Sequence, residues 1–175
     1  MLLLRFFINI LCILITITLQ RKLNCCPKGW INNEESCYYV IRHQLDFNTA
    51  EHYCASKHSI LVEVESIDEW NLIRQLPPTD RYFWIGIRDS SYDNNIITSA
   101  RGSILTIQQL TYLPWLVKKK NNIQKRDNGW SSLSKCAAYF NVINVNAGYI
   151  YFYNCNLNFF AICERNVTKF GFHSI

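Results

Sequence analysis

The chain has 175 residues, of which 49% are hydrophobic and 14% aromatic, so it can form a packed core and is not expected to be disordered. Lys and Arg outnumber Asp and Glu by 18 to 13. No helix-borne basic stripe or aromatic stacking platform accompanies that excess, so nucleic-acid binding is not expected. Beyond an apolar N-terminal segment, the remaining length suits one domain better than two.

The N-terminal segment is apolar over residues 6–19, with Arg5 before it and Arg21 and Lys22 after it. Its length suits a signal peptide better than a full membrane span. No clear small-x-small cleavage site follows, so the alternative of an uncleaved membrane anchor stays open. In such an anchor, however, the basic pair would lie on the wrong side of the membrane. We expect residues 1–22 to be a signal peptide or signal anchor. The protein is then secreted or extracellular, or alternatively a type II membrane protein with the domain outside, and it meets the membrane only if the segment is uncleaved.

The chain contains eight cysteines and begins with this apolar segment, a combination that indicates an exported domain held by disulfides. Six form the expected frame: Cys26, Cys37, Cys54, Cys136, Cys155 and Cys163. No Cys-x-x-Cys pair is present, and an exported chain uses cysteines in disulfides before zinc.

The pattern after the first cysteines predicts a hairpin over residues 25–39 and then two helices. Phe47, Ala50 and Cys54 share one face of a helix over 47–58, capped by Asp46 or Asn48. A capping box, in which Ser66 and Glu69 satisfy each other's backbone amides, starts a second helix that runs to about residue 75.

A buried strand is predicted over residues 82–87, with Gly86 at a place where backbone segments pass closely. Residues 88–135 lack strong periodicity and are rich in Asn, Ser and Lys, which is typical of a functional loop when it occurs inside a compact domain. Three closing strands are predicted over residues 136–142, 149–154 and 159–163.

Five segments occur in an order known from one family. They are Cys-Cys-Pro-Lys-Gly-Trp (25–30), Ser-Cys-Tyr-Tyr (36–39), Phe-Trp-Ile-Gly-Ile (83–87), Cys-Ala-Ala-Tyr (136–139) and Phe-Ala-Ile-Cys-Glu (160–164). Residues 25–165 resemble a C-type lectin-like domain, and the first two segments resemble its natural-killer-cell receptor branch. The resemblance implies an α+β fold with two helices, two small antiparallel sheets, a long loop region and three disulfides, over a domain of residues 23–165 followed by a tail, 166–175.

The resemblance also implies which cysteines pair. The expected bonds are Cys26–Cys37, Cys54–Cys163 and Cys136–Cys155, although Cys25 competes with Cys26 for Cys37. An unpaired Cys25 leads to the hypothesis of a disulfide-linked homodimer. A sequon, Asn166-Val-Thr168, predicts glycosylation at Asn166.

Calcium decides between functions in this family. Sugar-binding members hold Ca²⁺ with a Glu-Pro-Asn or Gln-Pro-Asp triplet in the long loop and a Trp-Asn-Asp triplet before the second-last cysteine. The equivalent positions fall near residues 119–122 and at residues 150–152, and neither triplet is present there. Between Trp70 and Cys163 there is no Glu, whereas Ca²⁺ needs six to eight oxygen ligands. No metal and no cofactor is therefore expected, and Asp89 and Asp93 are interpreted as shaping a turn rather than sharing an ion.

No catalytic set is visible, so an enzyme is not expected. There is no Gly-x-Ser-x-Gly elbow or phosphate loop, and Asp68 and Glu69 are explained as negative charge at a helix start. The leading hypothesis is calcium-independent binding of a cell-surface protein, receptor or ligand, through the long loop. The alternatives are a lectin of altered type that binds glycans, and a secreted toxin or enzyme.

Seven long-loop residues are the candidate binding set: Tyr92, Tyr112, Trp115, Lys118, Lys119, Lys120 and Trp130. Exposed aromatic side chains are the usual anchors of protein recognition, but these rings could equally form the loop's own core. The lysines, with Lys125 and Arg126, either meet an anionic surface or form a solvated basic loop.

Overall fold

The computed structural model describes residues 24–33, 36–93, 96–118, 123–143 and 147–169, and these divide into two compact units. In the first unit, β1 (Asn24–Cys25) pairs antiparallel with β9 (Thr168–Lys169). The Cys26–Cys37 disulfide closes a loop that contains β2 (Ile31–Asn33). β2 is hydrogen-bonded to β3 (Ser36–Leu45), so the hairpin predicted over residues 25–39 is confirmed, with the Cys26–Cys37 disulfide across it.

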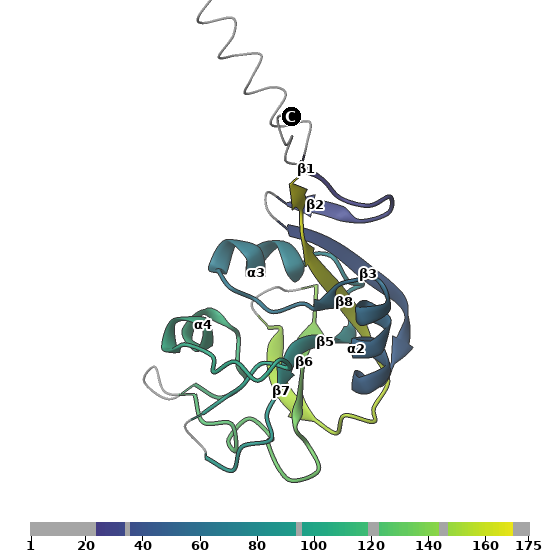
Figure 1. Cartoon of the computed structure of the whole chain (residues 1–175). Helices are drawn as coiled ribbons and strands as arrows, with labels where there is room; N and C mark the ends of the chain where they lie inside the picture. The colour runs from purple at the N-terminus through teal and green to yellow at the C-terminus, as the bar shows by residue number, and fades with distance from the viewer. Residues whose placement is uncertain (1–23, 34–35, 94–95, 119–122, 144–146, 170–175) are drawn as a thin grey trace, which may run out of the picture. The chain divides into compact units, whose positions relative to one another are not determined.

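The second unit, residues 38–165, is built on a mixed sheet. Its strand order is β3-β8-β5-β6-β7, with β4 beside β8 (Figure 1). The strands are β3 (Ser36–Leu45), β4 (Ile60–Leu61), β5 (Arg81–Arg88), β6 (Cys136–Asn141), β7 (Tyr149–Tyr153) and β8 (Phe159–Asn166). The fold class is confirmed, but β5 and β8 run parallel, with Phe83 beside Phe160, so the sheets are not purely antiparallel.

Three helices occur among the described residues, one more than expected. α2 (Phe47–Ser56) buries Phe47, Ala50 and Cys54 as its spacing predicts, and Asp46 caps it by accepting the Thr49 amide. α3 (Ile67–Ile73) starts at Ser66, but Glu69 accepts the amide of Glu65 instead of that of Ser66. The third helix, α4 (Ile107–Tyr112), lies within the long loop and, in Figure 1, on the other side of β5 from α2.

Two further disulfides join elements of the second unit. Cys54–Cys163 links α2 to β8, and Cys136–Cys155 links the start of β6 to the turn after β7. With Cys26–Cys37, these are the pairs that the resemblance implies. At Gly86 a side chain would lie 2.8 Å from the carbonyl oxygens of residues 61 and 62, so β5 does pass that segment closely.

The core extends from the sheet into the long loop. Sheet residues such as Phe83, Ile85 and Tyr139 pack with loop residues in one buried cluster. The loop residues in it are Ile97, Leu113, Trp115, Ile123 and Trp130. The loop is therefore a packed part of the domain, and its conformation is held from inside.

Candidate functional site

A fully buried ion pair lies at the centre of the long loop. The Lys125 Nζ is 2.6 Å from the Asp89 carboxylate, and both side chains are 0% exposed. The ammonium also donates to the carbonyl of Ser91 and lies 4.5 Å from the centre of the Trp130 ring. Lys125 was expected in a solvated basic loop, and burial among these partners corrects that expectation.

Asp89 uses its remaining oxygens to shape the local backbone. Its carboxylate accepts the Ser91 amide at 2.7 Å and the Thr98 hydroxyl at 3.4 Å, while its carbonyl accepts the Trp130 indole N–H at 2.8 Å. The predicted turn-shaping role of Asp89 is thus observed. The ion pair, however, has no counterpart in the sequence prediction.

The two loop tryptophans are buried, at 4% exposure for Trp115 and 6% for Trp130. Trp115 stacks on Phe152 of β7, with ring centres 5.4 Å apart. A partner cannot reach these rings in this conformation, so the loop-core alternative holds for both and they are withdrawn as binding anchors.

The other candidate residues are distributed around this core. Tyr92 is 68% exposed and makes a T-shaped contact with the Trp130 ring, with ring centres 5.6 Å apart. Lys118 is exposed and its ammonium donates to the Thr111 carbonyl at 2.9 Å, while partial burial lowers its pKa. Lys119 and Lys120 lie outside the described residues.

Tyr112 is half-buried and fixes α4 to the rest of the domain. Its hydroxyl donates to the Val64 carbonyl at 2.9 Å, and the Gln109 amide donates to the same oxygen at 3.3 Å. Burial, followed by the charges of Glu69 and Glu65, raises the pKa of Tyr112 to about 12. This side chain supports the loop rather than standing free for a partner.

The long loop also exposes large apolar side chains that the sequence prediction missed. They are Ile104, Ile107, Leu116 and Leu133, at 66%, 77%, 52% and 74% exposure. Isoleucine and leucine in an aperiodic segment gave no signal of which ones face water. Together with Tyr92, they are the exposed large apolar side chains of the long loop, and we call this set the loop face.

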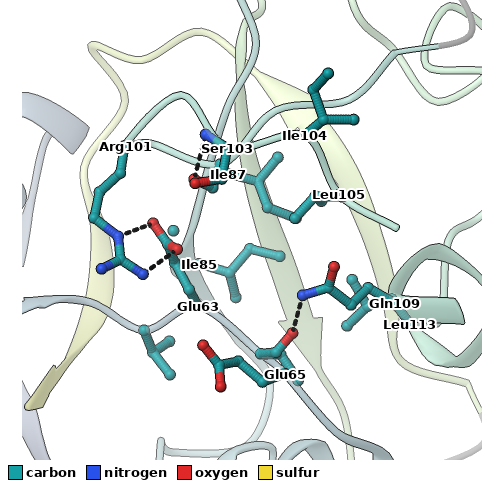
Figure 2. A pocket seen from close by; sticks show the side chains of 14 residues that line it. Glu63, Glu65, Ile85, Ile87, Arg101, Ser103, Ile104, Leu105, Gln109 and Leu113 are labelled. Atoms are coloured by element: carbon teal, nitrogen blue, oxygen red, sulfur yellow. Dashed lines mark hydrogen bonds and ion pairs between the residues drawn. The ribbon is translucent and has the colours of Figure 1, made fainter. Parts of the chain in front are cut away.

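A pocket lies beneath the first half of the long loop, and we call it the Glu65 pocket (Figure 2). Its volume is about 130 Å³, and it lies between residues 62–65, β5 and residues 99–113. Ile85, Leu105 and Leu113 line it from the apolar side, and Glu63, Glu65 and Arg101 are its charged residues.

The described residues contain no group of three or more His, Cys, Asp or Glu side chains that could hold a metal ion. Within the same ranges, no helix is long and apolar enough to cross a membrane. Asn166, the predicted glycosylation site, is exposed at the end of β8.

The family model described as Lectin C-type domain matches residues 43–165. The chain belongs to the C-type lectin domain family. C-type lectin domain-containing protein 88 of Caenorhabditis elegans is 37% identical over 145 residues, 82% of this chain and 62% of that protein. This lectin domain therefore spans about three fifths of that relative's length.

Support for the natural-killer-cell receptor-like branch comes at lower identity. Human C-type lectin domain family 2 member B is 28% identical over 80 residues, 46% of this chain and 52% of that protein.

Two solved structures share the fold. The mouse scavenger receptor C-type lectin carbohydrate-recognition domain has a TM-score of 0.64 and 23% identity, covering 82% of this chain and 100% of that one. A calcium-independent type II antifreeze protein has a TM-score of 0.63 and 17% identity, covering 82% of this chain and 96% of that one.

Proposed function

We propose that this C-type lectin domain binds a protein ligand on a cell surface, without calcium and without catalysis, through its loop face. The buried Asp89–Lys125 pair is the main support. A carboxylate at 0% exposure needs a cation nearby, and here a lysine of the same loop supplies it. The loop then requires no bound ion to neutralise Asp89.

The composition of the loop face supports a protein ligand over a glycan. Tyr92, Ile104 and Ile107 present apolar area to water, and large exposed apolar and aromatic side chains are typical anchors of protein interaction sites. Lys118 adds a cation beside α4, the helix that carries Ile107, and this charge would speed association with an acidic partner. The calcium-independent type II antifreeze protein, which shares this fold, gives a precedent for such a domain without calcium.

A binding screen against an array of cell-surface ectodomains, run with and without chelator, tests this function. We expect a partner whose binding is unchanged by chelator. Tyr92→Ala should weaken it mainly through faster dissociation, and Lys118→Ala should slow association. Binding that requires Ca²⁺, or a glycan array hit without any protein hit, would replace the proposal with the sugar-binding alternative.

We also propose that the domain is extracellular, secreted or anchored through residues 1–22, and that Cys25 links two copies. In the described structure Cys26 bonds to Cys37, which leaves Cys25 outside the three disulfides. A non-reducing gel of the wild type should show a dimer that Cys25→Ser abolishes. A wild type that runs only as a monomer would remove the dimer and leave the binding proposal intact.

A further inference from the structure

The Glu65 pocket differs in charge from the chain as a whole. The chain carries a net charge of +5, yet two of the three charged residues that line the pocket are acidic, Glu63 and Glu65. A third carboxylate, that of Glu164, accepts the backbone amide of Glu63 at 3.3 Å. Acidic side chains thus outnumber basic ones in the lining of this cavity, whereas basic ones outnumber acidic ones in the chain as a whole.

Glu63 shows which kind of cation fits this cavity. Its side chain is only 11% exposed and takes two hydrogen bonds from the Arg101 guanidinium, at 2.7 and 3.1 Å. Figure 2 shows the fork of Arg101 facing the Glu63 carboxylate at the pocket edge. That bond, and then the charges of Glu63, Glu164 and Glu65, raises the pKa of Arg101. A guanidinium on a long side chain is therefore already accommodated here.

Glu65 offers a second carboxylate at the same pocket. It is exposed, and Figure 2 shows its carboxylate on the same side as that of Glu63, across from Ile87 and Leu105. The opposite wall is apolar, and a cavity of about 130 Å³ has room for one long side chain. An apolar wall facing carboxylates suits an aliphatic stem that ends in a cation.

We propose that the Glu65 pocket receives an arginine or lysine side chain of the protein partner, with the stem against Leu105 and the cation at Glu65. This rests on the proposed function, since the pocket opens beside the loop face. Ile104, which lines the pocket and is 66% exposed, would then contact the residues that flank the basic side chain. Charge complementarity favours this occupant, because a basic side chain carries the charge opposite to that of Glu65, whereas an acidic one would be repelled.

The test is a nuclear magnetic resonance titration of the full chain with two capped tripeptides. One carries arginine between two leucines, and the other carries citrulline, which has nearly the same shape without the charge. The arginine peptide should shift the backbone amide signals of Gly86, Arg101 and Leu105 saturably. The citrulline peptide should bind at least about tenfold more weakly, because hydrogen bonds between charged groups are roughly twice as strong as neutral ones.

Glu65→Gln should weaken the arginine peptide at least about tenfold, the loss expected for one hydrogen bond to a charged group. Asp68→Asn is the matched control, because it removes the same charge from an exposed position on α3 and should leave binding unchanged. Equal binding of the two peptides, or a Glu65→Gln variant that binds like the wild type, would overturn the proposal. Free butylguanidine binding as tightly as the peptide would also overturn it, by assigning the pocket to a small molecule.

Failure here is distinguishable from failure of the proposed function. If neither peptide binds while Tyr92→Ala still weakens the partner, the pocket proposal falls and the loop face stands. If the partner is insensitive to both Tyr92→Ala and Glu65→Gln, the loop face and the pocket fall together.

Discussion

Asp89 and Lys125 form a buried ion pair that joins the start of the long loop to its second half. Both are withdrawn from water, so each charge must be compensated by the other and by nearby polar groups. The compensation is nearly complete, because the Ser91 carbonyl and the Trp130 ring also surround the ammonium. Removing one partner leaves an uncompensated charge in the interior.

Lys125→Met should therefore destabilise the domain by about 3–5 kcal/mol, the usual cost of breaking a buried pair from one side. Urea unfolding measures it. Lys118→Met, at an exposed position, is the control and should cost less than about 1 kcal/mol. Adding Asp89→Asn to Lys125→Met should recover part of the loss. A Lys125→Met variant as stable as the control would contradict the pair's role.

The sequence did not reveal which lysine is buried. Lys125 follows a run of lysines and precedes Arg126, and in such a run nothing distinguishes the buried cation from the solvated ones. The tryptophans were ambiguous for a similar reason, since an aromatic ring in an aperiodic segment serves equally as an anchor or as loop core. Only the tertiary contacts of Trp115 and Trp130 decide this.

At the scale of elements, two glycines show how tightly the second half of the long loop packs. Gly129 and Gly102 have nearly the same positive φ, +85° and +86°. A side chain at Gly129 would lie 2.1 Å from the Tyr151 ring, whereas nothing lies within 4 Å of one at Gly102. The pair therefore separates backbone strain from crowding.

Gly102→Ala should cost only about 1–2 kcal/mol, the penalty of a left-handed conformation for a residue with a side chain. Gly129→Ala carries the same penalty plus about 1–3 kcal/mol for overpacking against Tyr151. Thermal unfolding of both variants gives the difference. Equal melting temperatures would show that the loop yields at Gly129 and is looser than described.

The sequence predicted the regular elements well and the loop's internal structure poorly. α2 and α3 follow from apolar spacing and from the caps at Asp46 and Ser66. α4 was missed although Thr106 and Gln109 form a capping box, because no apolar stripe follows it and none of its residues is buried. The Glu65 pocket was missed because its residues come from separate segments that only the fold brings together.

For the whole molecule, several tyrosines should link stability to alkaline pH. Burial raises the pKa of Tyr112 to about 12 and also raises that of Tyr139 and Tyr153, while the hydrogen bond between Tyr82 and Tyr149 raises the pKa of Tyr82. The folded chain therefore keeps phenol protons that the unfolded chain loses near pH 10. This stabilisation is present below about pH 10 and is lost as pH rises toward about 12.

Phenolate absorbance followed over pH, together with urea unfolding at each pH, measures this loss. A group of tyrosines should ionise late and with the unfolding transition, and Tyr112→Phe should reduce the loss between about pH 10 and 12. All ten tyrosines ionising together near pH 10 would contradict the described burial.

Calcium independence is the central claim for the molecule as a whole, and calorimetric titration of Ca²⁺ into the full chain tests it most directly. A bound ion would stabilise the fold by mass action, by about 4 kcal/mol at a thousandfold excess over its dissociation constant. We predict no saturable heat and no change in melting temperature between millimolar Ca²⁺ and chelator, because Lys125 already compensates Asp89. A stoichiometric site of micromolar affinity would contradict the account and restore the sugar-binding alternative.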